Sequence, residues 1–468
     1  MLDKIIILDM DSYGSIAIAK RLRAQQIFCK ILPGSAGEAD IRKEDPRGVI
    51  WVGSDNPAFA VDPETIQMGL PILAIGAASH RLAQELGAGL EGVSLKNAAE
   101  TVTYTRDALF ENVSEGERWF PLAERIELPT NLTVIAKTEG FAAGFRDRER
   151  PLYGLQFTIE SNDPDGLKIL TNFCLNVCQC TEWWSPEAFI ERTTADIARF
   201  ADGRRVVCAL SGGVDSGVCA MLAHRAVGAM MTPVYIDGGL SRTDNDTKIE
   251  MFCRNKLKME CVKVNARQAF LDNLKGVSDQ ERKIAVVQDT YRHAFEDYLG
   301  GETPNACMIL GTNYSEVLSN PKNRDNYRHV PDSMPLIEPL VELFKDEVRA
   351  VGELLELPAP ILHAQPFPMS GLASRINGAV SENLLTILRA ADSIFSQEVD
   401  GAGQDRRLRL YYATLEAFQG VAVVLHAFTS GDKSQSARLP FDLLAKVAER
   451  IAAEVPGVGN VYYDVTAR

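Results

Sequence analysis

The stretch Ser211-Gly212-Gly213-Val214-Asp215-Ser216 decides the fold of the central part of this chain. It follows the apolar run RVVCAL, which is typical of a buried strand, and precedes GVCAMLAHRAVG, which is typical of a helix. The glycines let the backbone turn tightly and aim successive N–H groups at one point, while the helix adds the positive end of its dipole. The two serines add hydroxyl donors. Together these groups predict an anion cradle that fits phosphate or pyrophosphate.

Asp215 indicates what kind of phosphate site this is. A carboxylate repels phosphate unless a cation lies between them, so its presence in the loop predicts Mg²⁺. A bare Ser-Gly-Gly is most often a turn that caps a helix, but the whole hexapeptide between a strand and a helix favours nucleotide binding. The chain has no Gly-Lys pair, which excludes a Walker-type loop. Residues 87–92 spell G-x-G-x-x-G, but they follow the helical HRLAQEL and are expected to end that helix.

Strand and helix patterns alternate on both sides of this loop. The expected strands are IIILD, GVIWVG, PILAIG, LTVIAKT and LYGLQF before it, and TPVYID, CVKVN and ACMILG after it. Such alternation predicts an α/β fold with parallel sheets and crossover helices. Beyond the proline-rich stretch 357–368 the pattern is mainly helical, with strand-like RLRLYYATL, AVVLHAF and NVYYDV. We therefore expect three domains, 1–185, 186–365 and 366–468, with a hinge at the Trp-Trp-Ser-Pro of 183–186.

The composition narrows the classes of function. The 468 residues are 46% hydrophobic and 24% charged, which is ordinary for a globular protein with more than one core. A formal charge of −14 argues against binding to nucleic acid or to an anionic membrane surface. No apolar run approaches the ~20 residues that span a bilayer. Asp9 and Asp11 interrupt the first apolar run too early for a signal peptide, and nine cysteines in such a chain predict a reducing cytoplasm.

The loop resembles that of the N-type ATP pyrophosphatases, and nearly the whole chain is similar to the GMP synthase family. In that family a class I glutaminase-like α/β domain comes first. An adenine-nucleotide α-hydrolase-like domain with a parallel sheet and a small α+β dimerisation domain follow. The resemblance implies an AMP-forming ligase that uses ATP and Mg²⁺ to adenylate a carbonyl oxygen of a purine or purine nucleotide. A nucleophile then displaces AMP. It also implies a homodimer.

The same resemblance assigns roles to residues outside the loop. Tyr235–Leu240 is similar to the strand and turn whose backbone holds adenine, and Lys345 lies in a Lys-Asp-Glu-Val segment that contacts phosphate. Asp215 and Lys345 are thus the implied catalytic residues, and Asp215 and Glu347 the implied Mg²⁺ ligands. The implied nucleotide-binding residues are Ser211, Gly212, Gly213, Val214, Asp215, Ser216, Ile236, Gly311 and Thr312.

The glutaminase-like part departs from the family pattern. Its strand PILAI runs into Gly76 where the family has the nucleophilic cysteine, and the family's His-Pro-Glu appears as Thr158-Ile159-Glu160. Only the glutamate is kept. Since a Cys–His site needs both the nucleophile and the base, we predict that this part does not hydrolyse glutamine. Ser79 and His80 are not expected to replace them, because neighbours on a helix point about 100° apart.

The acceptor-binding segments also differ. The family's Pro-Phe-Pro-Gly-Pro-Gly-Leu is Pro366–Leu372 here, followed by a retained Arg375. The histidine-rich lid is replaced by the shorter stretch 323–331, and the chain stops at Tyr463-Asp464-Val465-Thr466-Ala467-Arg468 without the family's tail. Arg328, His329 and Arg375 are our candidates for contact with the acceptor.

Three functions stay open at this point. The first is substitution by a nitrogen nucleophile, either free ammonia or ammonia from a separate donor protein. The second is sulfur insertion by a thiolating enzyme of a thiopurine-type pathway with its own sulfur donor. Cys253, Cys261 and Cys307 are candidate sulfur carriers, although cysteines are more commonly buried without reactivity. The third is a catalytically silent nucleotide-binding regulator, which the intact loop with Asp215 and Lys345 disfavours.

Overall fold

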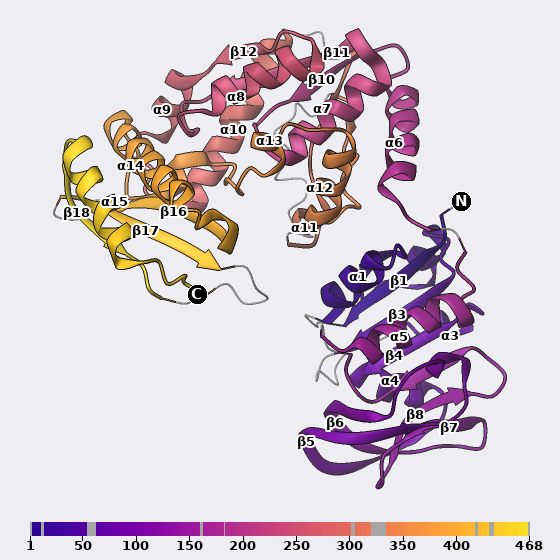
Figure 1. The fold of residues 1–468 in the computed structure, drawn as a ribbon. Helices are drawn as coiled ribbons and strands as arrows, with labels where there is room; N and C mark the ends of the chain where they lie inside the picture. The colour runs from indigo at the N-terminus through magenta and orange to yellow at the C-terminus, as the bar shows by residue number, and fades with distance from the viewer. Residues whose placement is uncertain are drawn as a thin grey trace. The chain divides into compact units, whose positions relative to one another are not determined.

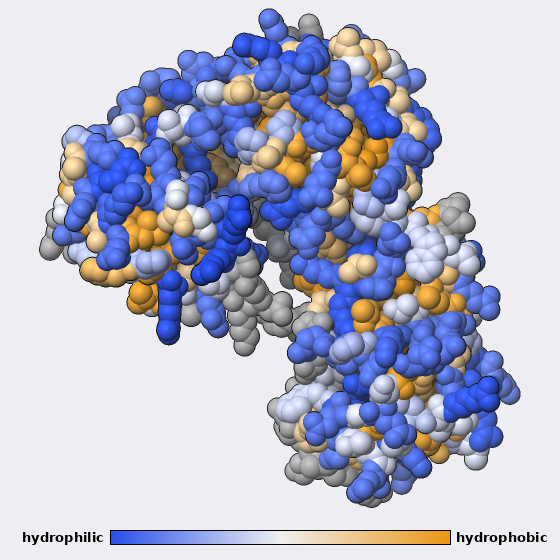
Figure 2. All heavy atoms as spheres, in the orientation of Figure 1, coloured by the Kyte–Doolittle hydropathy of each residue, from blue (hydrophilic) through white to orange (hydrophobic). Residues whose placement is uncertain are grey.

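The computed structural model divides the chain into two compact units, Met1–Ser185 and Pro186–Arg468 (Figure 1). It describes residues 2–10, 14–53, 62–159, 162–181, 183–300, 305–319, 334–416, 420–429 and 435–466, without the side chains of 90–97 and 122–125. On the face in Figure 2, hydrophilic residues predominate on each unit and apolar ones form small groups. Within the described part of the chain, no helix is long and apolar enough to cross a bilayer.

The first unit is built on one nine-stranded sheet in the order β2-β1-β3-β4-β9-β8-β7-β5-β6. Its strands are β1 (Lys4–Met10), β2 (Phe28–Pro33), β3 (Gly48–Gly53), β4 (Ile72–Gly76), β5 (Gly89–Tyr104), β6 (Gly116–Glu127), β7 (Leu132–Lys137), β8 (Ala142–Asp147) and β9 (Leu152–Leu155). Its helices are α1 (Gly14–Ala24), α2 (Glu38–Lys43), α3 (Glu64–Gln67), α4 (Ala77–Glu85) and α5 (Pro164–Asn172).

Only half of this sheet has the parallel arrangement that the sequence predicts. Strands β2, β1, β3, β4 and β9 pair in parallel, and the continuous apolar run of Ile5–Leu8 is fully buried, as is typical of a sheet covered on both faces. The expected strand LTVIAKT forms β7, but it pairs antiparallel with β8 and β5, so the prediction of parallel pairing is wrong there. Helix α4 does end before Gly87, whose φ is +88°, so the interpretation of residues 87–92 as a helix terminus is confirmed.

The second unit contains a parallel sheet in the order β12-β11-β10-β13-β14. Its strands are β10 (Arg205–Ala209), β11 (Met231–Asp237), β12 (Val262–Asn265), β13 (Ala306–Ile309) and β14 (Leu336–Ile337). The helices of this part are α6 (Pro186–Ala201), α7 (Val214–Val227), α8 (Asn245–Phe252), α9 (Arg267–Leu274), α10 (Gln280–Leu299), α11 (Tyr314–Ser319), α12 (Lys345–Leu354) and α13 (Ala359–Leu362). The chain moves outward from β10 to β12 and then returns to β13 on the other side of β10. Ligands of open α/β sheets bind where the strand order reverses in this way, at the carboxyl ends of the strands.

The C-terminal part of this unit is a second sheet with two long helices. Strands β15 (Ile376–Asn377), β16 (Leu408–Glu416), β17 (Val421–Thr429) and β18 (Val458–Tyr463) form the sheet in that order, and the helices are α14 (Glu382–Gly401) and α15 (Phe441–Glu454). The Ser381 hydroxyl caps α14 by accepting from the Leu384 N–H (3.3 Å). One hydrophobic core joins Val207 and Phe270 of the parallel-sheet part to Phe395 and Val447 of the C-terminal helices. The division at 365/366 into separate domains stays a prediction.

Candidate active site

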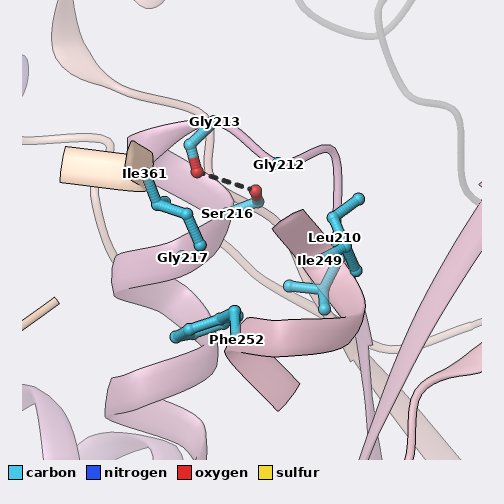
Figure 3. Close-up of a pocket in the computed structure, with 8 residues that line it drawn as sticks. All are labelled: Leu210, Gly212, Gly213, Ser216, Gly217, Ile249, Phe252 and Ile361. Atoms are coloured by element: carbon cyan, nitrogen blue, oxygen red, sulfur yellow. Dashed lines mark hydrogen bonds between the residues drawn. The ribbon is translucent and has the colours of Figure 1, made fainter. Parts of the chain in front are cut away.

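The phosphate loop joins β10 to α7 and is held by its own serines. The Oγ atoms of Ser211 and Ser216 lie 3.1 Å apart, and Ser216 also donates to the Gly213 carbonyl (3.1 Å). Gly212 has φ +82°, which favours glycine, and Gly213 begins the helix in extended backbone. Figure 3 shows Ile249, Phe252 and Ile361, which line a small gap beside the loop. This gap is too small to hold a nucleotide by itself.

Two neighbouring segments press closely on the loop. The Asn245 side chain donates to the Ser211 carbonyl (3.1 Å), and its Oδ1 lies 2.2 Å from where a Cβ on Gly212 would stand. Gly311 follows β13, the strand beside β10. A Cβ on Gly311 would lie 2.8 Å from the Asp215 carbonyl carbon and 3.0 Å from the Ser216 nitrogen. Glycine at 212 therefore leaves room for the Asn245 side chain, and glycine at 311 lets the segment after β13 approach the backbone of the loop.

Asp215 and Lys345, the two predicted catalytic residues, form an ion pair. Asp215 is the second residue of α7, and Lys345 is the first of α12, so the tertiary fold brings together residues 130 positions apart. Asn313 points its amide at the other Asp215 oxygen (3.5 Å). Thr312 donates to Glu338 Oε1 (2.6 Å), which ties the segment after β13 to the one after β14. A cation and a carboxylate thus stand beside the phosphate loop.

The predicted metal ligand Glu347 is nearly buried, with 9% of its surface exposed. One of its carboxylate oxygens accepts from the Phe344 N–H (2.8 Å) and so caps the helix that carries Lys345. Mg²⁺ is usually held by one or two carboxylates together with substrate phosphates, and the donor set of Asp215 and Glu347 fits that requirement. Among the described residues there is no cluster of three or more His, Cys, Asp or Glu that could hold a metal on its own.

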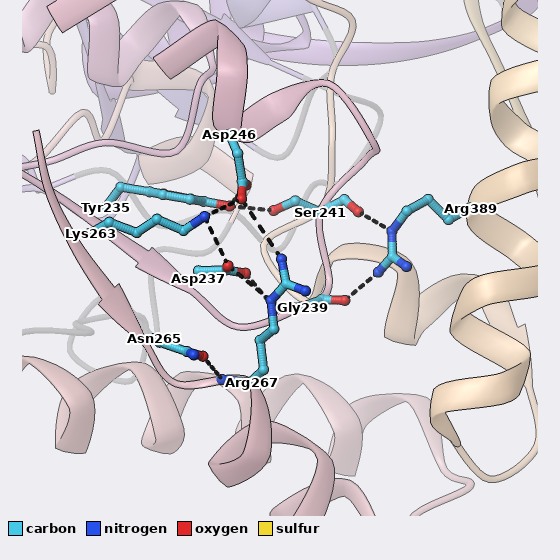
Figure 4. A network of polar contacts seen from close by, with 9 residues as sticks. All are labelled: Tyr235, Asp237, Gly239, Ser241, Asp246, Lys263, Asn265, Arg267 and Arg389. Atoms are coloured by element: carbon cyan, nitrogen blue, oxygen red, sulfur yellow. Dashed lines mark hydrogen bonds and ion pairs between the residues drawn. The ribbon is translucent and has the colours of Figure 1, made fainter. Parts of the chain in front are cut away.

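Ile236, the predicted adenine-binding residue, lies buried in β11, next to β10 in the sheet. The turn that follows is fixed by Asp237, which accepts from the Gly239 N–H (3.0 Å) and from Arg267 (2.9 Å). Figure 4 shows this network, in which Lys263 and Arg267 each form ion pairs with Asp246 as well as with Asp237. The turn is therefore held in a defined position at the carboxyl end of β11, while the adenine-binding role of Ile236 stays a prediction.

The three predicted acceptor residues differ in what the structure describes. Arg328 and His329 lie outside the described residues. Arg375 is 6% exposed, donates to Asp392 (3.1 Å), and has its guanidinium 4.8 Å from the Phe367 ring and 4.6 Å from the Tyr412 ring. Burial lowers the pKa of Arg375 to about 10, although Asp392 opposes the shift. Arg375 is thus a packed part of the C-terminal unit, and its contact with an acceptor stays a prediction.

The glutaminase-like unit keeps the shape of a nucleophile site without the nucleophile. Gly76 ends β4 with φ +64° and ψ −134° and begins α4, the sharp strand-to-helix turn that exposes a nucleophile in hydrolases. A Cβ there would have only ordinary contacts, the nearest at 3.4 Å. The Ser79 hydroxyl donates to the Gly76 carbonyl (2.7 Å), and His80 Nε2 lies 2.8 Å from Gln156 Oε1, both in buried positions. Glu160 lies outside the described residues.

The candidate sulfur carriers are buried or half-buried thiols. Cys253 and Cys307 are fully buried, and burial raises the pKa of the Cys307 thiol. Cys261 is half-buried and immediately precedes β12, four residues before Asn265, which is the register partner of Asp237 at the carboxyl end. At about 3.3 Å per residue this places Cys261 roughly 13 Å from that end of the strand.

Sequence reasoning missed the residues that brace the site. Asn245 holds the loop, and it belongs to no motif with a mechanistic pattern. Asn313 and Glu338, which contact Asp215 and Thr312, lie in segments that resemble the family's nucleotide site, but the resemblance gave neither residue a role. A weak signal was available, because each lies within eight residues after the end of a strand of the parallel sheet, where ligand-binding side chains gather.

Comparison with known proteins shows the family to which the chain belongs. Residues 204–313 match the family model of the tRNA methyl transferase HUP domain. A GMP synthase [glutamine-hydrolyzing] of Clostridium novyi (strain NT) is 34% identical, covering 99% of this chain and 97% of that protein. That of Clostridium perfringens is 34% identical over 100% and 98%. A solved structure from Thermoplasma acidophilum, described as a candidate GMP synthase subunit, covers 38% of this chain and 95% of its own at 20% identity with a TM-score of 0.34, too slight a likeness to support an argument. Because the similarity to the curated relatives runs from end to end, the chain belongs to the GMP synthase family and is an ATP-using, AMP-forming ligase of that type.

Proposed function

We propose that this chain adenylates a carbonyl oxygen of a purine nucleotide with ATP and substitutes AMP with ammonia that its first unit does not generate. The observation behind this proposal is a contrast within one chain. The phosphate loop has its serines, its Asp215 and its Lys345 in contact, whereas the glutaminase elbow presents Gly76. The second unit therefore has the groups for ATP cleavage, while the first unit lacks the nucleophile that releases ammonia from glutamine. We infer that the ammonia comes from another source.

In the first step the substrate's carbonyl oxygen attacks the α-phosphorus of ATP. The bond between the α-phosphorus and the bridging oxygen breaks, and pyrophosphate leaves. The N–H groups of the loop and the positive end of α7 bind the leaving pyrophosphate, and the Lys345 ammonium exchanges its Asp215 partner for a phosphate oxygen. Asp215 and Glu347 would hold Mg²⁺, which supplies further neutralisation of that charge when bound. In the second step ammonia attacks the activated carbon, AMP departs with its bonding electron pair, and a proton is released.

The first unit supports the part of the proposal that concerns nitrogen. The curated relatives are named as glutamine-hydrolysing, and that activity needs a nucleophile and a base. At the elbow of this chain a glycine offers no nucleophile. Thr158, in the place of the histidine, has its N–H bonded to the Trp119 carbonyl (2.9 Å), and a hydroxyl is not a base at neutral pH. We infer that glutamine does not support turnover and that free ammonia or a separate donor protein does.

Two further features complete the proposal. We infer a homodimer from membership of the family, to be tested by light scattering of the purified chain. We also infer a reducing cytoplasmic setting, because nine cysteines in 468 residues are not the disulfide-dense composition of small secreted domains.

The experiment is to incubate the full chain with Mg-ATP and each of a panel of purine nucleotides that includes xanthosine 5′-monophosphate, together with ammonium, glutamine or sulfide. AMP and pyrophosphate are quantified, and the product mass is measured. We expect AMP and an amino product with ammonium, and none with glutamine. The Lys345→Gln variant serves as the matched control and should lower the formation of AMP and pyrophosphate about 100- to 1000-fold. Turnover with glutamine overturns the nitrogen proposal, a product with oxygen exchanged for sulfur makes the chain a thiolating enzyme, and no AMP from any purine nucleotide leaves a silent binding protein.

A further inference from the structure

Arg389 connects the C-terminal part of the second unit to the turn at the carboxyl end of β11 in the parallel sheet. It lies on α14, and its guanidinium donates two hydrogen bonds to the turn after β11. Nε donates to the Ser241 carbonyl (3.0 Å) and Nη2 to the Gly239 carbonyl (2.5 Å), as Figure 4 shows. Because an arginine fork holds two acceptors in a fixed geometry, it fixes both the position and the orientation of this turn.

The turn is also the start of the segment that braces the phosphate loop. Gly239 has φ +69°, and its N–H is held by Asp237, so the turn has a defined shape at its first residue. Four residues after Ser241, Asn245 begins α8 and donates to the Ser211 carbonyl (3.1 Å). A displacement of the turn therefore moves Asn245 and, through it, the loop.

The guanidinium of Arg389 is a partly buried charged donor to the turn. Arg389 is half-buried, and desolvation lowers the pKa of its guanidinium, although the neighbouring carboxylates of Asp237 and Asp246 oppose this shift. Removing the side chain leaves two carbonyls of a tight turn without their charged donor. The Leu372 N–H also donates to the carbonyl of Leu240 (2.8 Å), so the same turn is held from two sides by residues beyond 365.

We propose that Arg389 is a positioning residue for the phosphate loop, acting through the Gly239–Ser241 turn and Asn245. The nucleotide site is then completed by a helix from the C-terminal part of the chain. This inference rests on the proposed function only in taking the loop as the site of ATP.

The test measures equilibrium binding of α,β-methylene-ATP, which cannot be cleaved at the reacting bond, by calorimetry on the full chain. We expect Arg389→Ala to weaken binding about tenfold, within the usual range for coupling between sites, and Arg389→Lys to weaken it less. The matched control is Arg450→Ala on α15, which removes an equally large side chain whose partners Glu398 and Glu454 belong to the C-terminal helices. It should bind the analogue as the unaltered chain does.

A double-mutant cycle separates positioning from general loosening. If Arg389 acts through Asn245, the losses of binding free energy in Arg389→Ala and Asn245→Ala are not additive. The affinity of the double variant for the analogue is then within about twofold of that of the weaker-binding single variant. Unchanged binding in Arg389→Ala, an equal loss in Arg450→Ala, or additive losses would each overturn the inference. Absence of AMP formation with an intact binding cycle overturns the proposed function alone, whereas no binding by the unaltered chain overturns both.

Discussion

Replacing Gly311 with alanine tests how closely the segment after β13 packs against the phosphate loop. The new Cβ would lie 2.8 Å from the Asp215 carbonyl carbon, 2.9 Å from the Asp215 Cβ and 3.0 Å from the Ser216 nitrogen. Two of these three atoms belong to the backbone at the start of α7, and none is the end of a flexible side chain. The loop, rather than a neighbouring rotamer, has to move.

The size of the effect follows from these distances. Carbon atoms in contact normally lie about 3.5–4.0 Å apart, so the loop or the segment after β13 must shift by roughly 0.5–1 Å. Overpacking of this kind costs about 1–3 kcal/mol of unfolding free energy. A displacement of about 1 Å in catalytic groups lowers rates by as much as about 100-fold, and Asp215 is among the groups displaced. We therefore expect a moderate loss of stability and a larger loss of AMP formation.

Two measurements check this expectation. Chemical denaturation gives the unfolding free energy, and AMP formation with ammonium gives kcat/KM. The control is Gly401→Ala at the end of α14, where a Cβ meets nothing within 4 Å and alanine favours the helix, so neither quantity should fall. A Gly311→Ala chain that unfolds at the same denaturant concentration and forms AMP at the unaltered rate would refute the close approach on which the site description rests.

Three further predictions follow from other contacts. Lys345→Gln should lower pyrophosphate release about 100- to 1000-fold while changing the unfolding free energy by under about 1 kcal/mol, since partly exposed ion pairs stabilise little. A variant that loses activity only because it also unfolds would contradict a catalytic role. Burial raises the pKa of Asp147, but hydrogen bonds from the Glu149 and Arg150 amides and the Arg150 side chain outweigh it and lower the pKa. The carboxylate therefore stabilises the fold above its unfolded pKa of about 4, and the difference in unfolding free energy between the unaltered chain and Asp147→Asn should shrink as the pH falls below that value. Iodoacetamide at about pH 7.5 should label Cys261 first among the nine thiols, because a hydrogen bond from Cys253 lowers its pKa. The same hydrogen bond, together with burial, raises the pKa of Cys253, and burial raises that of Cys208. Peptide mass spectrometry that finds another cysteine labelled first counts against this.

The sequence determined the phosphate loop because its chemistry is local. A strand, a glycine turn with two serines and a helix follow one another without interruption, and backbone geometry alone aims their donors at one point. The replacement of the glutaminase cysteine by Gly76 is likewise visible in a single position. Alternating apolar runs predicted the parallel strands of both units, whose buried faces leave a continuous hydrophobic pattern. The same pattern was misleading for β7, because the pairing direction depends on a partner strand and not on the strand's own residues.

Only the tertiary structure decided how distant segments meet at the loop. Lys345 reaches Asp215 across 130 positions, Gly311 fits against Ser216, and Arg389 holds a turn 148 residues before it. None of these contacts has a spacing that recurs in sequence, since each depends on which strand ends lie side by side and on how α14 packs against the sheet. Arg375 shows the same limit in reverse, because its neighbours Asp392, Phe367 and Tyr412 give it a packed position that its own sequence surroundings do not reveal. Local chemistry is written in consecutive residues, whereas the packing that makes it a site is a property of the whole fold.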